Sequence, residues 1–148
     1  LDLPYVEIDS LFHGPNWRPR PEFLSDVDAF STGPRWITEW QYSAARDLLA
    51  SRADVLIWLD MPRCVTVWRV VRRTVRRRVR REFLWNGNRE PELRTLFTDR
   101  DHIVRWAWRT HADIGPRVIE ASSRHPGLVV VRLGLRSELE QWVSTVST

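Results

Sequence analysis

The sequence predicts an α/β domain with a parallel β-sheet, and three observations lead to this class. Residues 53–60 form an apolar run bounded by acids, as in a strand buried on both faces of a parallel sheet. Shorter strand-like stretches alternate with stretches of helical apolar spacing. The 148 residues suffice for one domain with one core. We therefore expect a single domain over residues 1–148, with right-handed crossovers between its strands.

The first part of the chain predicts two short strands and two helices. Residues 5–9 have the pattern of a short strand, and a Pro-rich loop follows them. Pro21 suits the first turn of a helix over residues 21–31, because the N–H that it lacks is not needed there. Residues 35–39 predict a second strand, and residues 43–50 predict a short helix.

The longest predicted helix follows the apolar run and carries much of the basic charge. Its apolar residues at helical spacing are Cys64, Val67, Trp68, Val71, Val75 and Val79. All 23 basic residues of the chain are arginines, and nine of them lie in residues 63–81, where no acid occurs. Arginine binds phosphate through paired donors, so this segment suits a nucleotide or a nucleic-acid backbone.

The last part of the chain predicts one more strand and several helices. A longer helix is expected from about residue 101 and should end or kink at Gly115-Pro116, because proline disrupts a helix interior. The other predicted elements are a loop, a short helix, a strand and a closing amphipathic helix, over residues 82–90, 91–97, 128–133 and 137–146.

Composition excludes several classes of protein. The single cysteine, Cys64, cannot form an internal disulfide, and the four histidines lack the spacing of metal ligands. No apolar run approaches the roughly 18 residues of a membrane span, and the first residues lack the pattern of a secretory leader. We therefore expect a protein of the reducing cytoplasm that has no membrane partner.

Three acids end predicted strands, at the edge of a parallel sheet where ligands bind. They are Asp9, Glu39 and Asp60. Each carboxylate suits a magnesium-bound water or a substrate hydroxyl in phosphoryl transfer, and capping of the following turn is the alternative role. The sequence favours capping most clearly for Asp60, which directly precedes a proline and the long helix.

Four arginines of the long helix, Arg69, Arg73, Arg76 and Arg80, are spaced by four, three and four residues. They therefore share one helical face and can converge on a polyphosphate. A solvated face and a contact with nucleic acid are the alternatives.

The tryptophans bear on the nucleic-acid alternative, because exposed aromatic rings can stack on bases. Five of the nine lie within apolar patterns and are predicted to belong to the core: Trp36, Trp58, Trp68, Trp106 and Trp108.

Several sequence segments, taken in their order along the chain, resemble the adenylate-kinase-like P-loop proteins, and specifically the group called DNA topology modulation proteins. They are Val6-Glu-Ile-Asp9 with Trp17, Trp36-Ile-Thr-Glu-Trp-Gln-Tyr-Ser43, Arg52-Ala-Asp-Val-Leu-Ile-Trp-Leu-Asp-Met-Pro-Arg63, Val70-Val-Arg-Arg-Thr74, Leu84-Trp-Asn-Gly-Asn-Arg-Glu90 and Trp108-Arg-Thr-His111. The resemblance spans nearly the whole chain. It implies a three-layer αβα P-loop NTPase-like fold, ATP and Mg²⁺ as cofactors, and phosphate transfer to a nucleotide or another small acceptor.

The resemblance also implies roles for individual residues. Nucleotide binding would fall to Arg69, Arg73 and Arg76, and catalysis to Arg73, Arg109 and Glu39, of which Arg109 would face the transferred phosphoryl group. A lid-like region at about residues 74–100 would use Arg80, Asn86, Asn88 and Arg89. The implied acceptor-binding residues are Asp9, Trp17, Tyr42 and Arg46. Mg²⁺ would have no direct protein ligand and would be held through water by Glu39 or Asp9.

Two departures from the family pattern qualify these implications. Trp40-Gln41-Tyr42 stands where the family commonly has Gly-Asn-Tyr, so the acceptor pocket should differ. The first strand, the G-x-x-x-x-G-K-[ST] loop and the first helix of the family do not occur in the 148 residues. We therefore expect a truncated chain that binds ATP weakly, with an unfilled sheet position beside the strand ending at Glu39. A nucleic-acid-binding module and a non-catalytic relative are the remaining alternatives.

Overall fold

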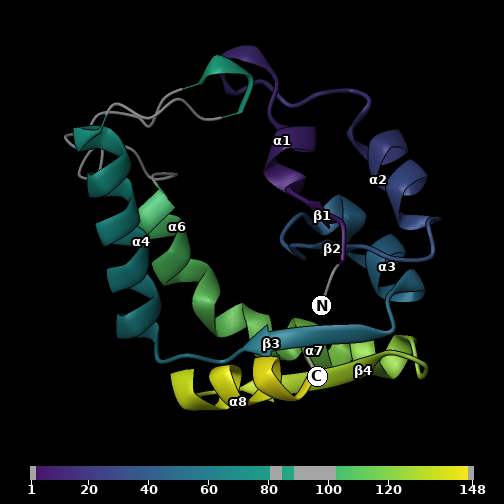
Figure 1. The fold of residues 1–148 in the computed structure, drawn as a ribbon. Coiled ribbons are helices and arrows are strands. Elements are labelled where there is room, and N and C mark those ends of the chain that lie inside the picture. Colours follow the sequence, from purple (N-terminus) through teal and green to yellow (C-terminus); the bar gives the residue numbers. More distant parts are fainter. Residues whose placement is uncertain (1–2, 81–84, 89–102, 147–148) are drawn as a thin grey trace.

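The computed structural model describes residues 3–80, 85–88 and 103–146, which form a mixed α/β structure (Figure 1). The helical elements lie between and after short strands, as the sequence predicts. They are α1 (Ile8–Phe12), η1 (Pro15–Trp17), α2 (Phe23–Ser31), α3 (Ser43–Arg52), α4 (Arg63–Val79), η2 (Trp85–Gly87), α6 (Ile103–Thr110), η3 (His111–Asp113), α7 (Ile114–Arg124) and α8 (Arg136–Val146).

The strands of the described residues form two parallel pairs and not one continuous sheet. β1 (Tyr5–Val6) pairs with β2 (Ile37–Thr38), and β3 (Val55–Leu59) pairs with β4 (Val129–Leu133). Each strand therefore has a single partner strand in this part of the chain. The predicted parallel pairing is confirmed, and α3 connects the two pairs because it runs from β2 to β3.

The first hydrophobic core lies between α1, α2 and α3. Ile8 and Val27 are fully buried in it, and Phe23, Ala45 and Leu49 complete it. The two core residues of α2 are four positions apart, as are the two of α3, so each helix presents one apolar face to the others. This core fixes the helices that surround the β1–β2 pair.

The second core joins α3 and α7 to the β3–β4 pair. Ala50 and Ala121 pack there with Leu128, and Leu56 of β3 contacts this group. Figure 1 shows α7 behind the pair and α8 in front of it. The ends of β3 are nevertheless open, because Val55 is 45% exposed and Leu59 is 49% exposed. The prediction that this strand is buried on both faces is therefore wrong, since its ends are exposed and its three middle residues are only half-buried.

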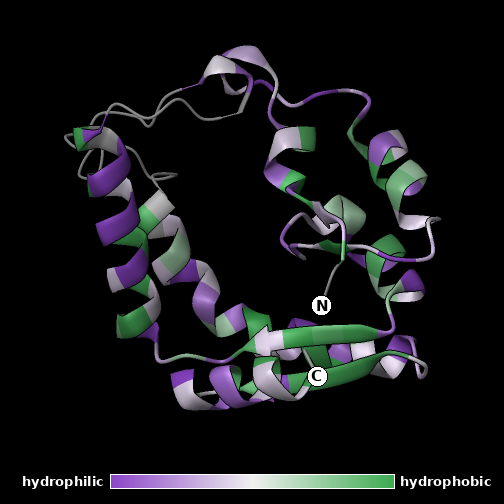
Figure 2. Cartoon of the chain, in the orientation of Figure 1, coloured by the Kyte–Doolittle hydropathy of each residue, from purple (hydrophilic) through white to green (hydrophobic). Residues whose placement is uncertain are grey.

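The helices α4 and α6 pack against each other in an arm that extends away from both cores (Figure 1). Figure 2 shows hydrophilic residues along much of α4. Thr74 is buried, and Val67 and Val70 are half-buried. These positions are separated by three and then four residues, so they lie on one narrow face of the helix, which points inward.

The apolar stripe predicted for this helix is wrong at most of its positions. Cys64, Trp68, Val75 and Val79 are exposed. The physical reason is that, among the described elements, α4 packs mainly on α6, and one helix covers less of its circumference than a sheet or a bundle would.

The prediction of core tryptophans is confirmed in part. Trp36 packs against the first core and meets Phe30 edge to face, with ring centroids 5.7 Å apart. In the arm, however, Trp68 is 63% exposed, and Trp106 and Trp108 are exposed as well. These three rings lie on the outside of the α4–α6 arm, where none of the described elements forms a further layer over them.

Two predicted boundaries also change. The first strand stops at Val6, and Asp9 lies in α1, because the carboxylate of Glu39 accepts the backbone N–H of Ile8 and starts the helix there. Gly115 and Pro116 begin α7 instead of ending the preceding helix, since proline is tolerated in a first turn.

The close approach of Trp58 explains the glycine at that junction. A Cβ atom at Gly115 would lie 3.3 Å from the Trp58 ring, so the ring would have to shift by a few tenths of an ångström to admit a larger residue. The predicted helix at residues 91–97 and the Arg89 end of the lid-like region lie outside the described residues. Within the described ranges, no helix is long and apolar enough to cross a membrane.

Candidate functional site

Polar side chains from α1, from the loop after it and from the segment after β2 meet at one place. The hydroxyl of Tyr42 donates to Oδ1 of Asp9 at 2.5 Å and lies 3.1 Å from Nε2 of His13. The side-chain amide of Gln41 also donates to Oδ1 of Asp9. We call Asp9, His13, Gln41 and Tyr42 the Tyr42 cluster. Two predicted acceptor-binding residues, Asp9 and Tyr42, are therefore in direct contact.

Aromatic rings surround the Tyr42 cluster on its core side. The Tyr42 ring stacks on Phe12 with centroids 4.1 Å apart, and it meets Phe23 edge to face at 5.2 Å. Burial, the hydrogen bond to Asp9 and the negative charges of Asp9 and Glu39 raise the pKa of Tyr42 above that of an ordinary tyrosine. The hydroxyl therefore stays protonated near neutral pH and acts as a hydrogen-bond donor to the carboxylate.

Glu39 lies beside this cluster and holds the start of α1. Its Oε2 accepts the N–H of Ile8 at 3.0 Å, and its Oε1 accepts the hydroxyl of Tyr5. Both carboxylate oxygens of Glu39 therefore have donors from the chain itself. Among the described residues, the side-chain hydrogen bonds of Asp9 end on Oδ1, which leaves Oδ2 for a ligand or a water.

The loop after α1 has an uncommon backbone conformation. Asn16 and Trp17 have φ angles of 57° and 59°, in the left-handed region. Asparagine visits this region readily, but a bulky residue such as tryptophan does so at an energetic cost. We call residues 13–18 the Trp17 loop, and its conformation must be held by contacts from elsewhere.

Those contacts come from the segment at residues 85–88, which is more than sixty residues later in the chain. The side-chain amide of Asn88 donates to the carbonyl of Gly14 at 2.9 Å, and its Oδ1 accepts the N–H of Trp17 at 3.1 Å. Asn86 donates to the carbonyl of His13. The structure thus brings two predicted lid residues onto a loop that holds the predicted acceptor residue Trp17.

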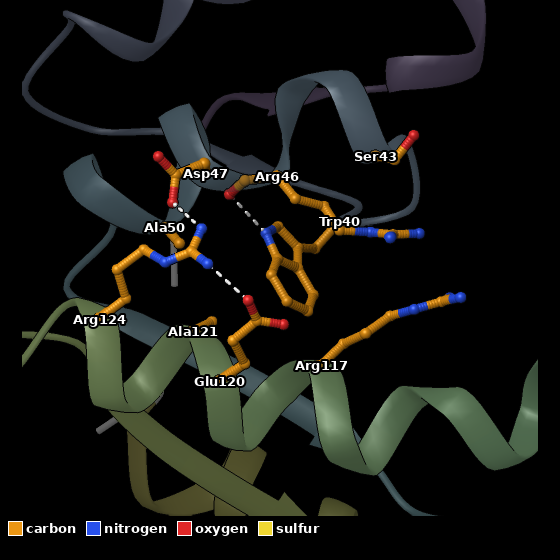
Figure 3. A pocket seen from close by; sticks show the side chains of 9 residues that line it. All are labelled: Trp40, Ser43, Arg46, Asp47, Ala50, Arg117, Glu120, Ala121 and Arg124. Atoms are coloured by element: carbon orange, nitrogen blue, oxygen red, sulfur yellow. Dashed lines mark hydrogen bonds and ion pairs between the residues drawn. The ribbon is translucent and has the colours of Figure 1, made fainter.

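A pocket of about 130 Å³ lies between α3 and α7, and Trp40 forms part of its wall (Figure 3). The indole N–H of Trp40 donates to the carbonyl of Arg46 at 2.8 Å. The Arg46 guanidinium donates to the carbonyl of Gln41 at 2.6 Å. Arg46, a predicted acceptor-binding residue, therefore connects the pocket to the Tyr42 cluster through Gln41.

The arginines predicted to bind nucleotide are not brought to this place. Arg69, Arg73 and Arg76 are exposed on α4, and Arg80 is exposed directly after it. Arg109 is exposed on α6, the other helix of the arm. Figure 1 shows the arm apart from β1 and α1, so these side chains and the Tyr42 cluster occupy different regions.

Sequence patterns did not predict two features of the site and one contact at the end of β3. His13 carries no spacing signal in the sequence, yet it contacts Tyr42. Arg117 lines the pocket, and no spacing in the sequence relates it to Arg46. Asp60, for which a cap was expected, instead accepts a hydrogen bond from Nε of Arg132 on β4 at 2.7 Å. Only the turn-forming residues around Trp17 gave a local signal of an unusual loop.

The side chains of the described residues include no group of three or more His, Cys, Asp or Glu that could hold a metal ion directly. Magnesium that is bound mainly by phosphate and water needs only one or two carboxylates from the protein, so Asp9 and Glu39 are compatible with it. No protein-family model, curated protein or solved structure matches this chain.

Proposed function

We propose that this chain is the larger part of an ATP-dependent phosphotransferase domain of the adenylate-kinase-like type, which phosphorylates a nucleotide or another small acceptor. The observation that carries the proposal is the arrangement of strands. β1–β2 and β3–β4 are parallel pairs, and β2 and β3 each lack a second partner strand among the described residues. One further parallel strand between β2 and β3 would join all of them into a single sheet of the kind that the resemblance implies.

The exposure of apolar residues on the strands supports an additional neighbour. Ile37 of β2 is exposed, and Val55 and Leu59 of β3 are exposed at its two ends. Unpaired strand edges with exposed apolar side chains are unfavourable in water, and proteins usually pair or cover them. A strand inserted there, with the helix that follows it, would bury these residues and give the domain its three layers.

The same strand would carry the loop that grips the triphosphate. In the proposal, this strand and loop come from residues outside the 148 of this sequence. The backbone N–H groups of the loop would hold the phosphates of ATP. Bound Mg²⁺ would neutralise phosphate charge during transfer. Oδ2 of Asp9 would hold a magnesium-bound water or the acceptor hydroxyl, while the Tyr42 hydroxyl keeps the carboxylate in place.

The arm has a role in this proposal although it lies apart from the Tyr42 cluster. Its exposed arginines, Arg69, Arg73 and Arg76, would reach the nucleotide only in a closed state in which the arm lies over the inserted loop. The contacts of Asn86 and Asn88 with the Trp17 loop support such a closure, since they already tie the segment that follows α4 to the acceptor side.

The test is ATP binding by two forms of the chain. Calorimetry should show magnesium-dependent ATP binding by a form extended through the in-frame residues that its gene encodes before Leu1, and much weaker binding by residues 1–148. In the extended form, Arg73→Ala should lower kcat by about 10²-fold, as for lost electrostatic stabilisers. An extended form that contains the phosphate-binding loop and still binds no ATP would contradict the proposal.

Nucleic-acid binding is the second candidate, and the exposed arginines of α4 favour it. Such binding would weaken steeply with salt, because each phosphate contact releases counterions. Affinity for unrelated duplexes that falls with salt and is lost on replacing Arg69 and Arg73 would favour this candidate over the kinase.

A further inference from the structure

The pocket between α3 and α7 holds more positive charge than its own carboxylates neutralise. Three arginines line it, Arg46, Arg117 and Arg124, together with the carboxylates of Asp47 and Glu120. The Arg124 guanidinium engages both carboxylates, with distances of 3.1 Å to Asp47 and 2.5 Å to Glu120. The other two arginines therefore have no carboxylate partner inside the pocket.

These two arginines extend toward the same open end of the pocket (Figure 3). Arg46 donates to the carbonyl of Gln41, and no carboxylate of the described residues lies within ion-pair distance of it. Arg117 pairs with Asp113 one turn earlier on α7 at 2.9 Å, in an exposed pair that an incoming anion can replace. Burial and then the positive charge of Arg117 lower the pKa of Arg46, which indicates that the two guanidinium groups repel each other.

The size and the wall of the pocket limit what can bind there. Its volume of about 130 Å³ is below the roughly 300–1,000 Å³ of pockets that enclose a whole ligand, so it admits one small group. The Arg46 guanidinium lies 5.7 Å from the centroid of the Trp40 ring, within range of a cation–π contact that favours this position of the side chain.

We propose that Arg46 and Arg117 bind the phosphate group of a small phosphate ester at the open end of this pocket. Two planar guanidinium groups offer paired donors that match phosphate oxygens, and the anion removes the repulsion between them. The assignment rests on the proposed function, in which the ester is the phosphoryl acceptor. Gln41 connects the two sites, because its carbonyl accepts from Arg46 and its side-chain amide donates to Asp9.

The test is a calorimetric titration of the 148-residue chain with inorganic phosphate at constant ionic strength. Arg117→Gln should raise the Kd by about tenfold or more, since a hydrogen bond to a charged group is lost. The control is Arg136→Gln on α8, which removes another ion pair between residues four apart, with Glu140 at 2.7 Å and away from the pocket, and should leave the Kd within about twofold. Arg46→Gln should also weaken binding, but Arg117→Gln decides the matter because Arg46 additionally holds the carbonyl of Gln41.

Each outcome of this titration has a defined meaning. No phosphate binding by the unsubstituted chain, or equal weakening by Arg117→Gln and Arg136→Gln, would overturn the assignment. A nucleoside 5′-monophosphate that binds more tightly than phosphate, with the same dependence on Arg117, would support it and identify a nucleotide ester, whereas equal affinity would support a non-nucleotide ester. Binding of a single-stranded oligonucleotide that depends on Arg117 and excludes phosphate would overturn it in favour of nucleic acid. The titration uses neither ATP nor phosphate transfer, so its failure and a failure of ATP binding are separate results.

Discussion

The region around the Tyr42 cluster and the α4–α6 arm use the same kinds of residue in opposite ways. Around the cluster, Trp36 and Tyr42 pack against the first core, and Arg52 holds Asp28 at 2.7 Å and Ser31 at 2.7 Å. In the arm, Trp68 is exposed, and so are four arginines of α4: Arg69, Arg72, Arg73 and Arg76. The difference follows from the number of neighbours: α1, α2 and α3 cover one another, whereas α4 packs mainly on one helix. The spacing of apolar residues predicted helices in both regions, but it did not predict which neighbouring elements cover each helix.

The largest expected effect compares one residue from each region. Ile8→Ala should lower the free energy of unfolding by about 2–5 kcal/mol, because Ile8 is 0% exposed and its removal leaves a cavity in the first core. Trp68→Ala, which removes a larger but exposed side chain, should change it by no more than about 0.5 kcal/mol. Urea denaturation of both variants measures this. Equal destabilisation by the two substitutions would show that the Trp68 side chain is buried in solution. The difference between the two regions would then not hold.

The second prediction concerns the contact that ties the two regions together. Asn88 is 6% exposed and makes two hydrogen bonds to the Trp17 loop, so Asn88→Ala should cost about 1–3 kcal/mol. Hydrogen exchange at the backbone N–H of Trp17 should accelerate in step with this loss. Asn86→Gly is the control, since glycine tolerates the left-handed φ of 54° at this position and the exposed Asn86 side chain contributes one hydrogen bond, so the effect should be smaller. Unchanged exchange at Trp17 in Asn88→Ala would contradict the clamp.

The third prediction addresses the electrostatics of the Tyr42 cluster. Tyr42→Phe should cost about 1–2 kcal/mol near neutral pH, because the Asp9 carboxylate loses a donor. The raised pKa also gives a pH dependence: above pH ~10 the unfolded chain releases the phenolic proton before the folded chain does, so stability falls as the pH rises. Denaturation at pH 8 to 11 should show this fall, and Tyr42→Phe should reduce it. An identical pH dependence in the variant would mean that Tyr42 is not the group involved.

The smallest effect is expected on the surface between α3 and the end of α7. Hydrogen bonds from His125 and Arg124 lower the pKa of Asp47. This carboxylate therefore adds stability above the ordinary aspartate pKa, and the contribution is lost as the pH falls through the lowered value in the folded chain. Asp47→Asn should shift the melting temperature only slightly at pH 7, because the pair is exposed. A shift as large as that of Asn88→Ala would show that this surface is more rigid than its exposure suggests.

Much of the secondary structure follows from the sequence because it depends on local chemistry. The helices at α2, α3 and α8 and the strands β3 and β4 lie within a few residues of their predicted bounds. The long apolar run does form the strand β3, although its ends are exposed, whereas Pro21 precedes the N-cap residue Glu22 of α2 and does not lie in the first turn of the helix. Asp9 and Tyr42 were also expected to act together, although the reason was a family resemblance and not their spacing.

Other features were decided only by the tertiary structure. The start of α1 depends on Glu39, thirty-one residues away from Ile8, so no local pattern could end β1 at Val6. The pairing of Arg46 with Arg117 depends on the packing of α3 against α7 in the second core. The sequence by itself determined where the chain is helical or extended and that its basic residues are all arginines. Long-range packing decided which of those arginines face a carboxylate, a neighbouring guanidinium or water. Charge interactions depend on distance in space and not on separation along the chain.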